Sequence, residues 1–244
     1  MKVAANRQSE NPYIISYRQL RMFIGLLGLM LTLLLVVTCM VVGDEYPFKI
    51  TISHFYYSCG HVIFVGTLCI LGGLFGTYKG NVKHENKVSN VTGILAVLVA
   101  VFPTQFAGFE GRRYLQLNQE YYQVWYSTVL MVCAGLLFIC FAVYCLYFFQ
   151  FLDEEAEESV GEKSIKKRRR NMYYKICGWG ILLSICGIAV FNLISDPQTS
   201  AQNAFLKYST IIFEVLALFF FSTSWLLKSS YCWSRKVPFI SYFR

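Results

Sequence analysis

The sequence predicts an all-α integral membrane protein, a bundle of six transmembrane helices whose N-terminus and C-terminus are both cytoplasmic. Of its 244 residues, 56% are hydrophobic, whereas soluble domains have about 45–50%. The apolar residues are concentrated in blocks close to the ~20 residues that cross a bilayer. Residues 1–244 therefore form a single transmembrane domain. We expect spans at approximately 22–42, 57–78, 91–106, 124–149, 173–194 and 208–227.

Basic residues alternate along the segments that flank these blocks. Of the 22 Lys and Arg residues, 18 fall at the ends of the blocks that would lie on one side of the membrane. The positive-inside rule makes that side cytoplasmic. The same distribution accounts for the net charge of +8 without a nucleic-acid partner, so the expected partner is the lipid bilayer. The other side has only four basic residues, Lys49, Arg112, Arg113 and Lys207.

The cysteines do not suggest a disulfide framework, a metal site or a cofactor. Cysteine within an apolar block behaves as a small hydrophobe, and Cys59, near the predicted outer surface, has no obvious outer partner. No C-x-x-C spacing occurs. Seven of the nine cysteines lie within the apolar blocks: Cys39, Cys69, Cys133, Cys140, Cys145, Cys177 and Cys186.

The largest cytoplasmic segment, a charged loop at 153–171, has an acidic run at 153–158 followed by a basic run. One interpretation is a solvated linker whose basic residues fix the topology. The other is a contact for anionic lipid head groups. The residues that would make this contact are Lys166, Lys167, Arg168, Arg169 and Arg170.

The segment 52–78 suggests where a functional site would lie. Read as one helix, it carries a stripe that is polar at the N-terminal end and small at the C-terminal end, including His54, His61 and Gly72. Polar groups inside a membrane must face protein or a water-filled cavity. Small residues at Gly25 and Gly28, and at Gly72 and Gly76, predict close helix–helix contacts.

Most titratable and polar candidates fall at the outer ends of the spans, where they could line one outward-facing polar pocket. Glu214 stands out because it lies among apolar residues. It is either a hydrogen-bonded structural carboxyl or a group that titrates or contacts a ligand. Pro103, Thr104, Glu110, Asn192, Ser195 and Asp196 lie at the same ends of the spans. The residues expected to line the pocket are His54, Tyr57, His61, Gln105 and Glu214.

His54, His61 and Glu214 could also be two histidines and a carboxylate around a metal ion. Their spacing argues against it, because positions i and i+7 of a helix are about 10 Å apart along its axis. A pair of hydrogen-bonded histidines lining the pocket is the favoured interpretation. The generic hydrolase, metalloprotease and phosphate-loop motifs are missing.

Several stretches resemble a family of uncharacterised bacterial six-span inner-membrane proteins, whose location this chain would share. The pattern S-Y-x-x-L-R is matched from Ser16 to Arg21, and I-S-H-x-Y from Ile52 to Tyr56. F-P-T is matched at 102–104. R-N-x-x-Y-x-x-C-G-W is matched at 170–179, and S-W-L-x-K at 224–228.

The chain departs from that family where its pattern reads H-T-P-x-R-D. Here the residues at 57–62 are YSCGHV, so an Arg–Asp pair at this place is missing. The chain is also distantly similar, in topology and in the I-S motif, to Frag1/DRAM/Sfk1-like membrane proteins.

The expected function is to bind a small solute or lipid head group in the outward-facing pocket, or to serve as a sensor or subunit of a membrane assembly. A membrane-embedded lipid-modifying enzyme is an alternative, with His54 or His61 as base or metal ligand and Glu214 as acid. An oligomeric channel or transporter is a second alternative, although no filter-like sequence or inverted repeat is visible.

Overall fold

The computed structural model describes residues 12–80, 84–104, 124–151, 162–194 and 204–231, and every regular element in these ranges is helical. The 3₁₀ helix η1 and the π-helical turn η3 interrupt the run of α-helices. The elements are α1 (Pro12–Val42), η1 (Ile52–Tyr57), α2 (His61–Thr77), α3 (Glu85–Val101), α4 (Val124–Val143), η3 (Tyr144–Phe148), α5 (Phe149–Phe151), α6 (Glu162–Ile194) and α8 (Ala204–Tyr231).

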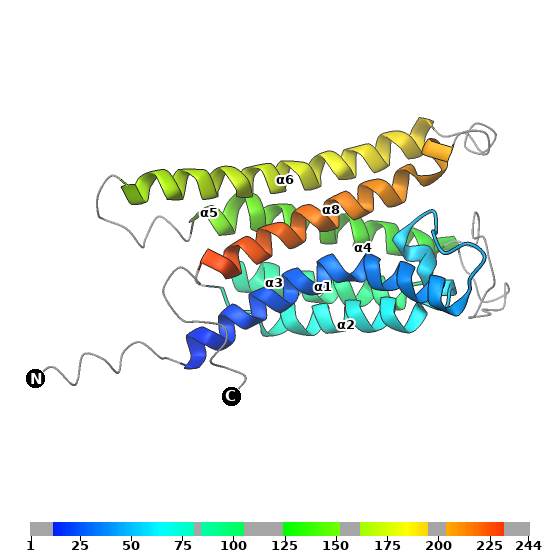
Figure 1. Ribbon diagram of the computed structural model, residues 1–244, viewed down its shortest axis with the longest axis horizontal. Coiled ribbons are helices and arrows are strands. Elements are labelled where there is room, and N and C mark those ends of the chain that lie inside the picture. Colours follow the sequence, from blue (N-terminus) through cyan, green and yellow to red (C-terminus); the bar gives the residue numbers. More distant parts are fainter. Residues whose placement is uncertain (1–11, 81–83, 105–123, 152–161, 195–203, 232–244) are drawn as a thin grey trace, which may run out of the picture.

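In the part of the chain that the structure describes, six long helices form a ring. Going round it, α1 packs on α2, α2 on α3, α3 on α4, α4 on α6, α6 on α8, and α8 returns to α1. Figure 1 shows these helices running roughly side by side along the long axis of the molecule. One end of the ring holds η1 together with the last turns of α1, α3 and α6 and the first turns of α2, α4 and α8. We call this the η1 end.

Among the described residues, four helices are long and apolar enough to cross a membrane: Tyr17–Val42, Trp125–Phe148, Arg168–Leu193 and Phe205–Ser229. The helices α2 and α3, in two of the six predicted spans, each have 17 residues. Val62 of α2 is 78% exposed and Ile94 of α3 is 61% exposed, whereas the first turns of α3 expose Asn86, Lys87 and Asn90.

Glycines bring neighbouring helices into backbone contact. A Cβ added to Gly28 of α1 would lie 2.8 Å from the ring of Phe221 in α8, and one added to Gly72 of α2 would lie 2.9 Å from the carbonyl oxygen of Gly93 in α3. The predicted contacts at Gly25, Gly28 and Gly72 are therefore confirmed. Gly76 also contacts α3, because a Cβ added to Gly93 would lie 3.2 Å from the backbone nitrogen of Gly76, although a Cβ added to Gly76 itself would meet no atom within 4 Å.

A cluster of aromatic rings fills the ring of helices away from the η1 end. Trp225 is fully buried, and its ring centroid lies 5.1 to 5.4 Å from those of Phe75, Tyr78, Tyr144 and Phe149. The π-helical turn η3 contributes to this packing, since Tyr144, Cys145 and Phe148 are all buried. We call Phe75, Tyr78, Phe141, Tyr144, Phe149, Phe221 and Trp225 the aromatic plug.

The expected single helix over 52–78 is wrong. The segment folds as η1 and α2, separated by Ser58, whose backbone is extended (φ −89°, ψ 177°). Ser58 Oγ donates to the carbonyl of Phe55 at 2.9 Å and accepts from the amide of Gly60 at 3.0 Å. These local bonds compete with helical ones and terminate the helix, so the predicted stripe from His54 to His61 does not exist.

The predicted charged loop at 153–171 is a helix in its second half, because α6 begins at Glu162. The backbone of Lys166, Lys167, Arg168, Arg169 and Arg170 is therefore the beginning of a long helix. Arg168 and Arg169 are exposed, whereas Arg170 is only 6% exposed. The basic run is thus divided between the surface and the bundle.

Candidate functional site: a cavity inside the helix ring

A cavity of about 770 Å³ lies within the ring of helices. This volume falls in the range of about 300–1,000 Å³ typical of ligand pockets. All six long helices contribute to its wall, together with the segment around η1, and most of the wall is apolar. Its polar side chains are Thr51, Ser53, His54, Thr104, Ser127, Asn192, Thr210 and Glu214.

These polar side chains gather at one end because each belongs to η1 or to the adjoining end of a helix. Thr51 precedes η1, where its side chain accepts a hydrogen bond from the amide of His54 and thereby caps the 3₁₀ helix. Thr51 Oγ1 also lies 3.1 Å from Nδ1 of the His54 ring. The cavity is therefore polar at the η1 end.

Glu214 joins this polar end to α8. Its Oε2 accepts a hydrogen bond from the backbone amide of Ile52 at 2.6 Å. Three residues earlier in α8, the backbone amide of Ile211 donates a hydrogen bond to the carbonyl of Ile50 at 3.1 Å. Two hydrogen bonds thus attach the segment that leads into η1 to the second and third turns of α8.

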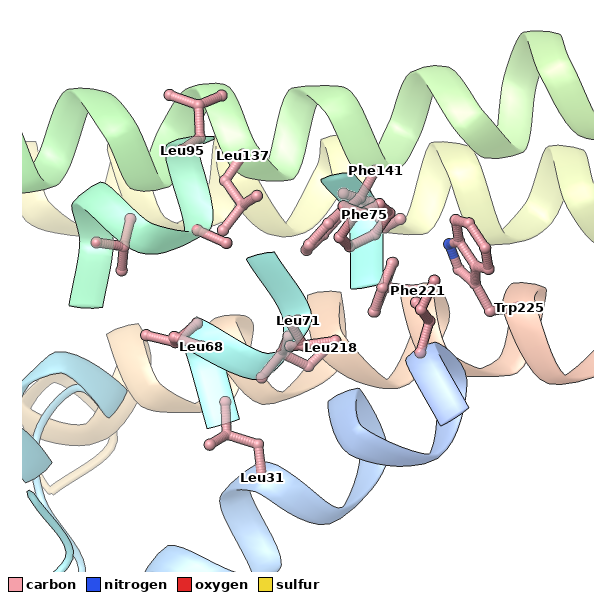
Figure 2. Close-up of a cluster of buried hydrophobic side chains, with 14 of the residues drawn as sticks. Leu31, Leu68, Leu71, Phe75, Leu95, Leu137, Phe141, Leu218, Phe221 and Trp225 are labelled. Carbon is pink, nitrogen blue, oxygen red and sulfur yellow. The ribbon is translucent and has the colours of Figure 1, made fainter. Parts of the chain in front are cut away.

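The opposite end of the cavity is apolar and borders the aromatic plug. Its lining there includes Phe75, Phe141 and Phe221 of the aromatic plug, and the rings of Phe141 and Phe221 stack with centroids 3.8 Å apart. Figure 2 shows Leu71, Leu218 and the plug residues Phe75, Phe141, Phe221 and Trp225 along the inside of the helices. A ligand would meet polar groups at one end and only hydrocarbon and aromatic surface at the other.

Replacing Glu214 with leucine is expected to release the segment before η1. The Ile52 amide would lose its acceptor, which costs about 1–3 kcal/mol, so hydrogen exchange of this amide should become roughly 5- to 150-fold faster. Glu214→Gln keeps a carbonyl acceptor and should retain most of the protection. Hydrogen–deuterium exchange of the peptide containing Ile52 measures this, and equal protection in the two variants would contradict the anchoring role.

The predicted pocket residues are not all brought together. His54 and Glu214 line the cavity, whereas Tyr57 and His61 are not part of its lining. Tyr57 is fully buried and its hydroxyl donates to the carbonyl of Thr104 at 2.6 Å. His61 Nδ1 lies 2.6 Å from the carbonyl of Tyr56, whose ring packs edge-on against the imidazole. Gln105 lies outside the described residues, as do Glu110, Ser195 and Asp196.

The two histidines and Glu214 do not form a metal site in the described part of the chain. Among the described residues, a different set of side chains could hold a metal ion. The possible ligand atoms of Cys39, Asp44 and Cys59 lie within 4.8 Å of one another. Burial raises the pKa of the Tyr56 hydroxyl in η1 above its ordinary value.

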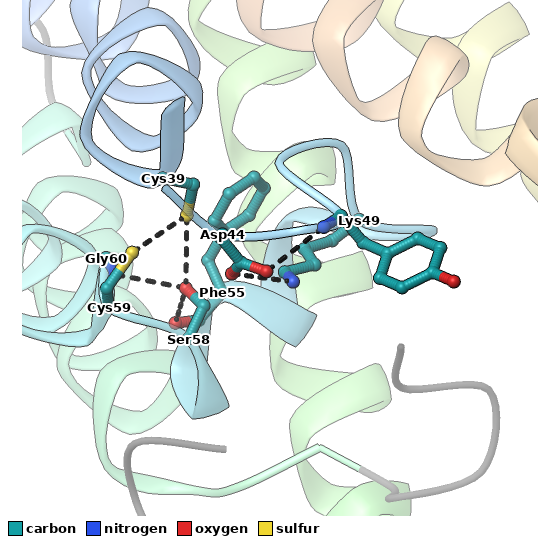
Figure 3. A network of polar contacts seen from close by, with 8 residues as sticks. Cys39, Asp44, Lys49, Phe55, Ser58, Cys59 and Gly60 are labelled. Atoms are coloured by element: carbon teal, nitrogen blue, oxygen red, sulfur yellow. Dashed lines mark hydrogen bonds and ion pairs between the residues drawn. The ribbon is translucent and has the colours of Figure 1, made fainter. Parts of the chain in front are cut away.

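The sequence did not predict the cluster of polar groups beside the cavity at the η1 end. Lys49 Nζ lies 3.0 Å from Asp44 Oδ2, and the two side chains are 1% and 0% exposed. Close to this ion pair, Cys39 Sγ and Cys59 Sγ are 3.2 Å apart. Figure 3 shows the two sulfurs in contact with Ser58 and the Asp44–Lys49 ion pair beside them. The only available sequence signal was that Asp44 and Lys49 flank a short turn rich in aromatic residues.

A second unforeseen cluster lies at the end of the bundle opposite η1. Arg21 donates to the Tyr78 hydroxyl at 3.2 Å, and this hydroxyl donates to Glu85 at 2.9 Å. The guanidinium of Arg21 also lies over the ring of Tyr17, 4.4 Å from its centroid. All of these residues except Tyr17 are buried. They join α1, α2 and α3 beneath the aromatic plug.

Comparisons with protein-family models, with curated protein sequences and with solved structures gave no match. The resemblance to bacterial six-span inner-membrane proteins therefore stays a prediction. The function of this membrane-type helical bundle is inferred from the cavity and the residues that line it.

Proposed function

We propose that this protein binds an amphipathic lipid inside its ring of helices. The cavity carries the proposal, because its lining has one polar end and one apolar end, which borders the aromatic plug. A hydroxyl or amine of the lipid would face Glu214, Ser53 and Thr104, and its apolar part would extend toward Phe141 and Phe221. The lipid would thereby keep its polar group hydrogen-bonded and its hydrocarbon out of water, which are the two requirements for burying such a molecule.

The proposal includes six spans, with α2 and α3 crossing the membrane beside the four longer helices, and both termini in the cytoplasm. The exposed apolar side chains of α2 and α3 support this arrangement. The concentration of Lys and Arg at alternate ends of the predicted spans supports it as well. The η1 end, and with it the polar end of the cavity, then faces outward. A bacterial inner membrane is the expected location on the family resemblance alone.

Other molecules of the membrane are proposed partners as well. Arg168 and Arg169 are exposed at the beginning of α6, where they suit contact with anionic lipid head groups. A second copy of the chain or another membrane protein would make the protein a sensor or subunit of an assembly. Retention of a specific lipid in the cavity is the property common to these roles.

Filling the cavity tests the proposal. Gly135 of α4 lines the cavity, and a Cβ added there meets no atom within 4 Å. Gly135→Phe should therefore place a ring in the space of the lipid without forcing helices apart. Native mass spectrometry of the protein released from mild detergent should show one lipid bound to the unmodified protein, and at least a tenfold lower occupancy in this variant.

Gly73→Phe is the matched control. Gly73 lies on the exposed face of α2, and a Cβ there also meets open space, so this variant adds the same side chain outside the cavity. It should keep the wild-type lipid occupancy. A wild-type protein without lipid, or equal occupancy in both variants, would contradict the proposed function.

A further inference from the structure

Two cysteines that the sequence separates by 20 positions meet at the η1 end. Cys39 Sγ, on the last turns of α1, lies 3.2 Å from Cys59 Sγ, between η1 and α2. Cys39 is fully buried and Cys59 is partly exposed. Cys39 Sγ also lies 3.7 Å from Ser58 Oγ, and Figure 3 shows both sulfurs pointing toward each other beside this hydroxyl.

The separation of the sulfurs favours a covalent bond over a shared metal ion. Two thiolates bound tetrahedrally to zinc at about 2.3 Å are roughly 3.8 Å apart, which is wider than the distance here. The third candidate ligand is already engaged, because the Asp44 carboxylate accepts from Lys49 Nζ and from the amide of Tyr46. The ammonium group of Lys49 would also repel a divalent cation.

We propose that Cys39 and Cys59 form a disulfide that joins the end of α1 to the beginning of α2. The sulfurs lie 3.2 Å apart, within about 1.2 Å of the bonded distance of about 2.05 Å. The proposal goes beyond ligand binding. It rests on the proposed outward orientation of the η1 end, since disulfides persist in oxidising compartments, and not on the identity of the lipid.

The oxidant is a disulfide of a thiol–disulfide exchange carrier. The thiolate of Cys59, the more exposed of the two, attacks one carrier sulfur, and the carrier disulfide breaks to give a mixed disulfide and one carrier thiolate. The thiolate of Cys39 then attacks Cys59 Sγ and releases the second carrier thiolate. Two protein thiols are oxidised, one carrier disulfide is reduced, and the two protons pass to the carrier sulfurs.

The bond would fix the polar end of the cavity. It closes the segment 39–59, which contains the buried Asp44–Lys49 pair and the cavity-lining residues Thr51, Ser53 and His54. Because burial disfavours the reactive thiolate, the bond should form as the chain folds and then resist exchange. It is thus a structural bond that holds η1 against α1 and α2.

Peptide mapping tests the bond. Membranes are treated with N-ethylmaleimide, and the full-length protein is purified, denatured without reductant, digested and analysed by mass spectrometry. We expect a linked pair of peptides containing Cys39 and Cys59, two hydrogens lighter than the sum of the thiol peptides. Cys39→Ser and Cys59→Ser should each abolish it, whereas Cys69→Ser, which replaces an exposed cysteine of α2, should keep it.

The melting temperature with and without reductant is a second test of the disulfide, for the case that the cysteine variants fold poorly. Reductant should lower the melting temperature of the wild-type protein in detergent by about 5–10 °C and leave that of Cys39→Ser/Cys59→Ser unchanged. Complete alkylation of both cysteines in the unreduced protein would overturn the proposal, and so would their protection by a retained metal ion. The native mass spectrum of the same preparation reports lipid separately. Lipid without the disulfide refutes this proposal alone, and the disulfide without lipid refutes the proposed function alone.

Discussion

Replacing Lys49 with methionine is expected to destabilise the folded protein by about 3–5 kcal/mol. Lys49 Nζ lies 3.0 Å from Asp44 Oδ2, and both side chains are almost completely buried. Methionine keeps a long apolar side chain but removes the charge, so the Asp44 carboxylate would remain buried without a counter-charge. Unfolding in mixed micelles of mild detergent and sodium dodecyl sulfate measures the change in the free energy of unfolding.

The double variant Lys49→Met/Asp44→Leu tests whether the unpaired Asp44 carboxylate causes the loss of stability. With both charges removed, no unpaired ion is left, and replacing a buried pair by apolar residues is often neutral, so most of the lost stability should return. Arg169→Met removes an exposed cation and should change stability by less than about 0.5 kcal/mol. A double variant as unstable as Lys49→Met would show that the loss arises from packing and not from the charge.

The helical architecture follows from hydropathy, and the breaks in it do not. Apolar blocks predicted the positions of α1, α4, α6 and α8 to within a few residues at most ends, because a membrane-type helix needs a continuous run of apolar side chains. The interruption at Ser58 depends on one hydroxyl bonding to Phe55 and Gly60. A serine in an apolar block carries no such signal, since its usual partner is the carbonyl of the preceding turn of a helix.

The candidate site could be predicted only where a polar side chain had no alternative to the inside of the bundle. Glu214 is such a case, and it lines the cavity. Tyr57 and His61 had alternatives, because the turns around η1 offered them the carbonyls of Thr104 and Tyr56. A 3₁₀ helix has about 3.0 residues per turn where an α-helix has 3.6, and the extended Ser58 follows it, so α-helical spacing from His54 gave the wrong direction for the His61 side chain.

The meeting of Cys39 with Cys59 illustrates the same limit. Cys39 lies in an apolar block, where sequence reasoning treats cysteine as a small hydrophobe. Its Sγ contacts Cys59 because the chain between them folds back over the end of α1, with the Asp44–Lys49 pair inside the turn. Contacts of this kind depend on the loop conformation, which periodicity does not encode.

Trp225→Ala is expected to destabilise the bundle by about 3 kcal/mol. The indole is fully buried in the aromatic plug, against Phe75, Tyr78 and Tyr144. Truncating a buried tryptophan costs about 3–5 kcal/mol, and the lower value applies here because helices that separate in a bilayer transfer apolar side chains to lipid and not to water. The free energy of unfolding in mixed micelles provides the measurement.

Trp179→Ala is the matched control, since Trp179 is 59% exposed on α6 and its loss leaves no internal void. Its stability should stay within about 0.5 kcal/mol of wild type. Trp225→Ala also removes support behind Phe75 and Phe221, which line the apolar end of the cavity. If this end limits the length of the bound lipid, the lipids retained by Trp225→Ala should shift to longer chains, whereas Trp179→Ala should retain the wild-type distribution. An unchanged distribution in a destabilised Trp225→Ala would mean that the plug stabilises the fold without setting the length of the ligand.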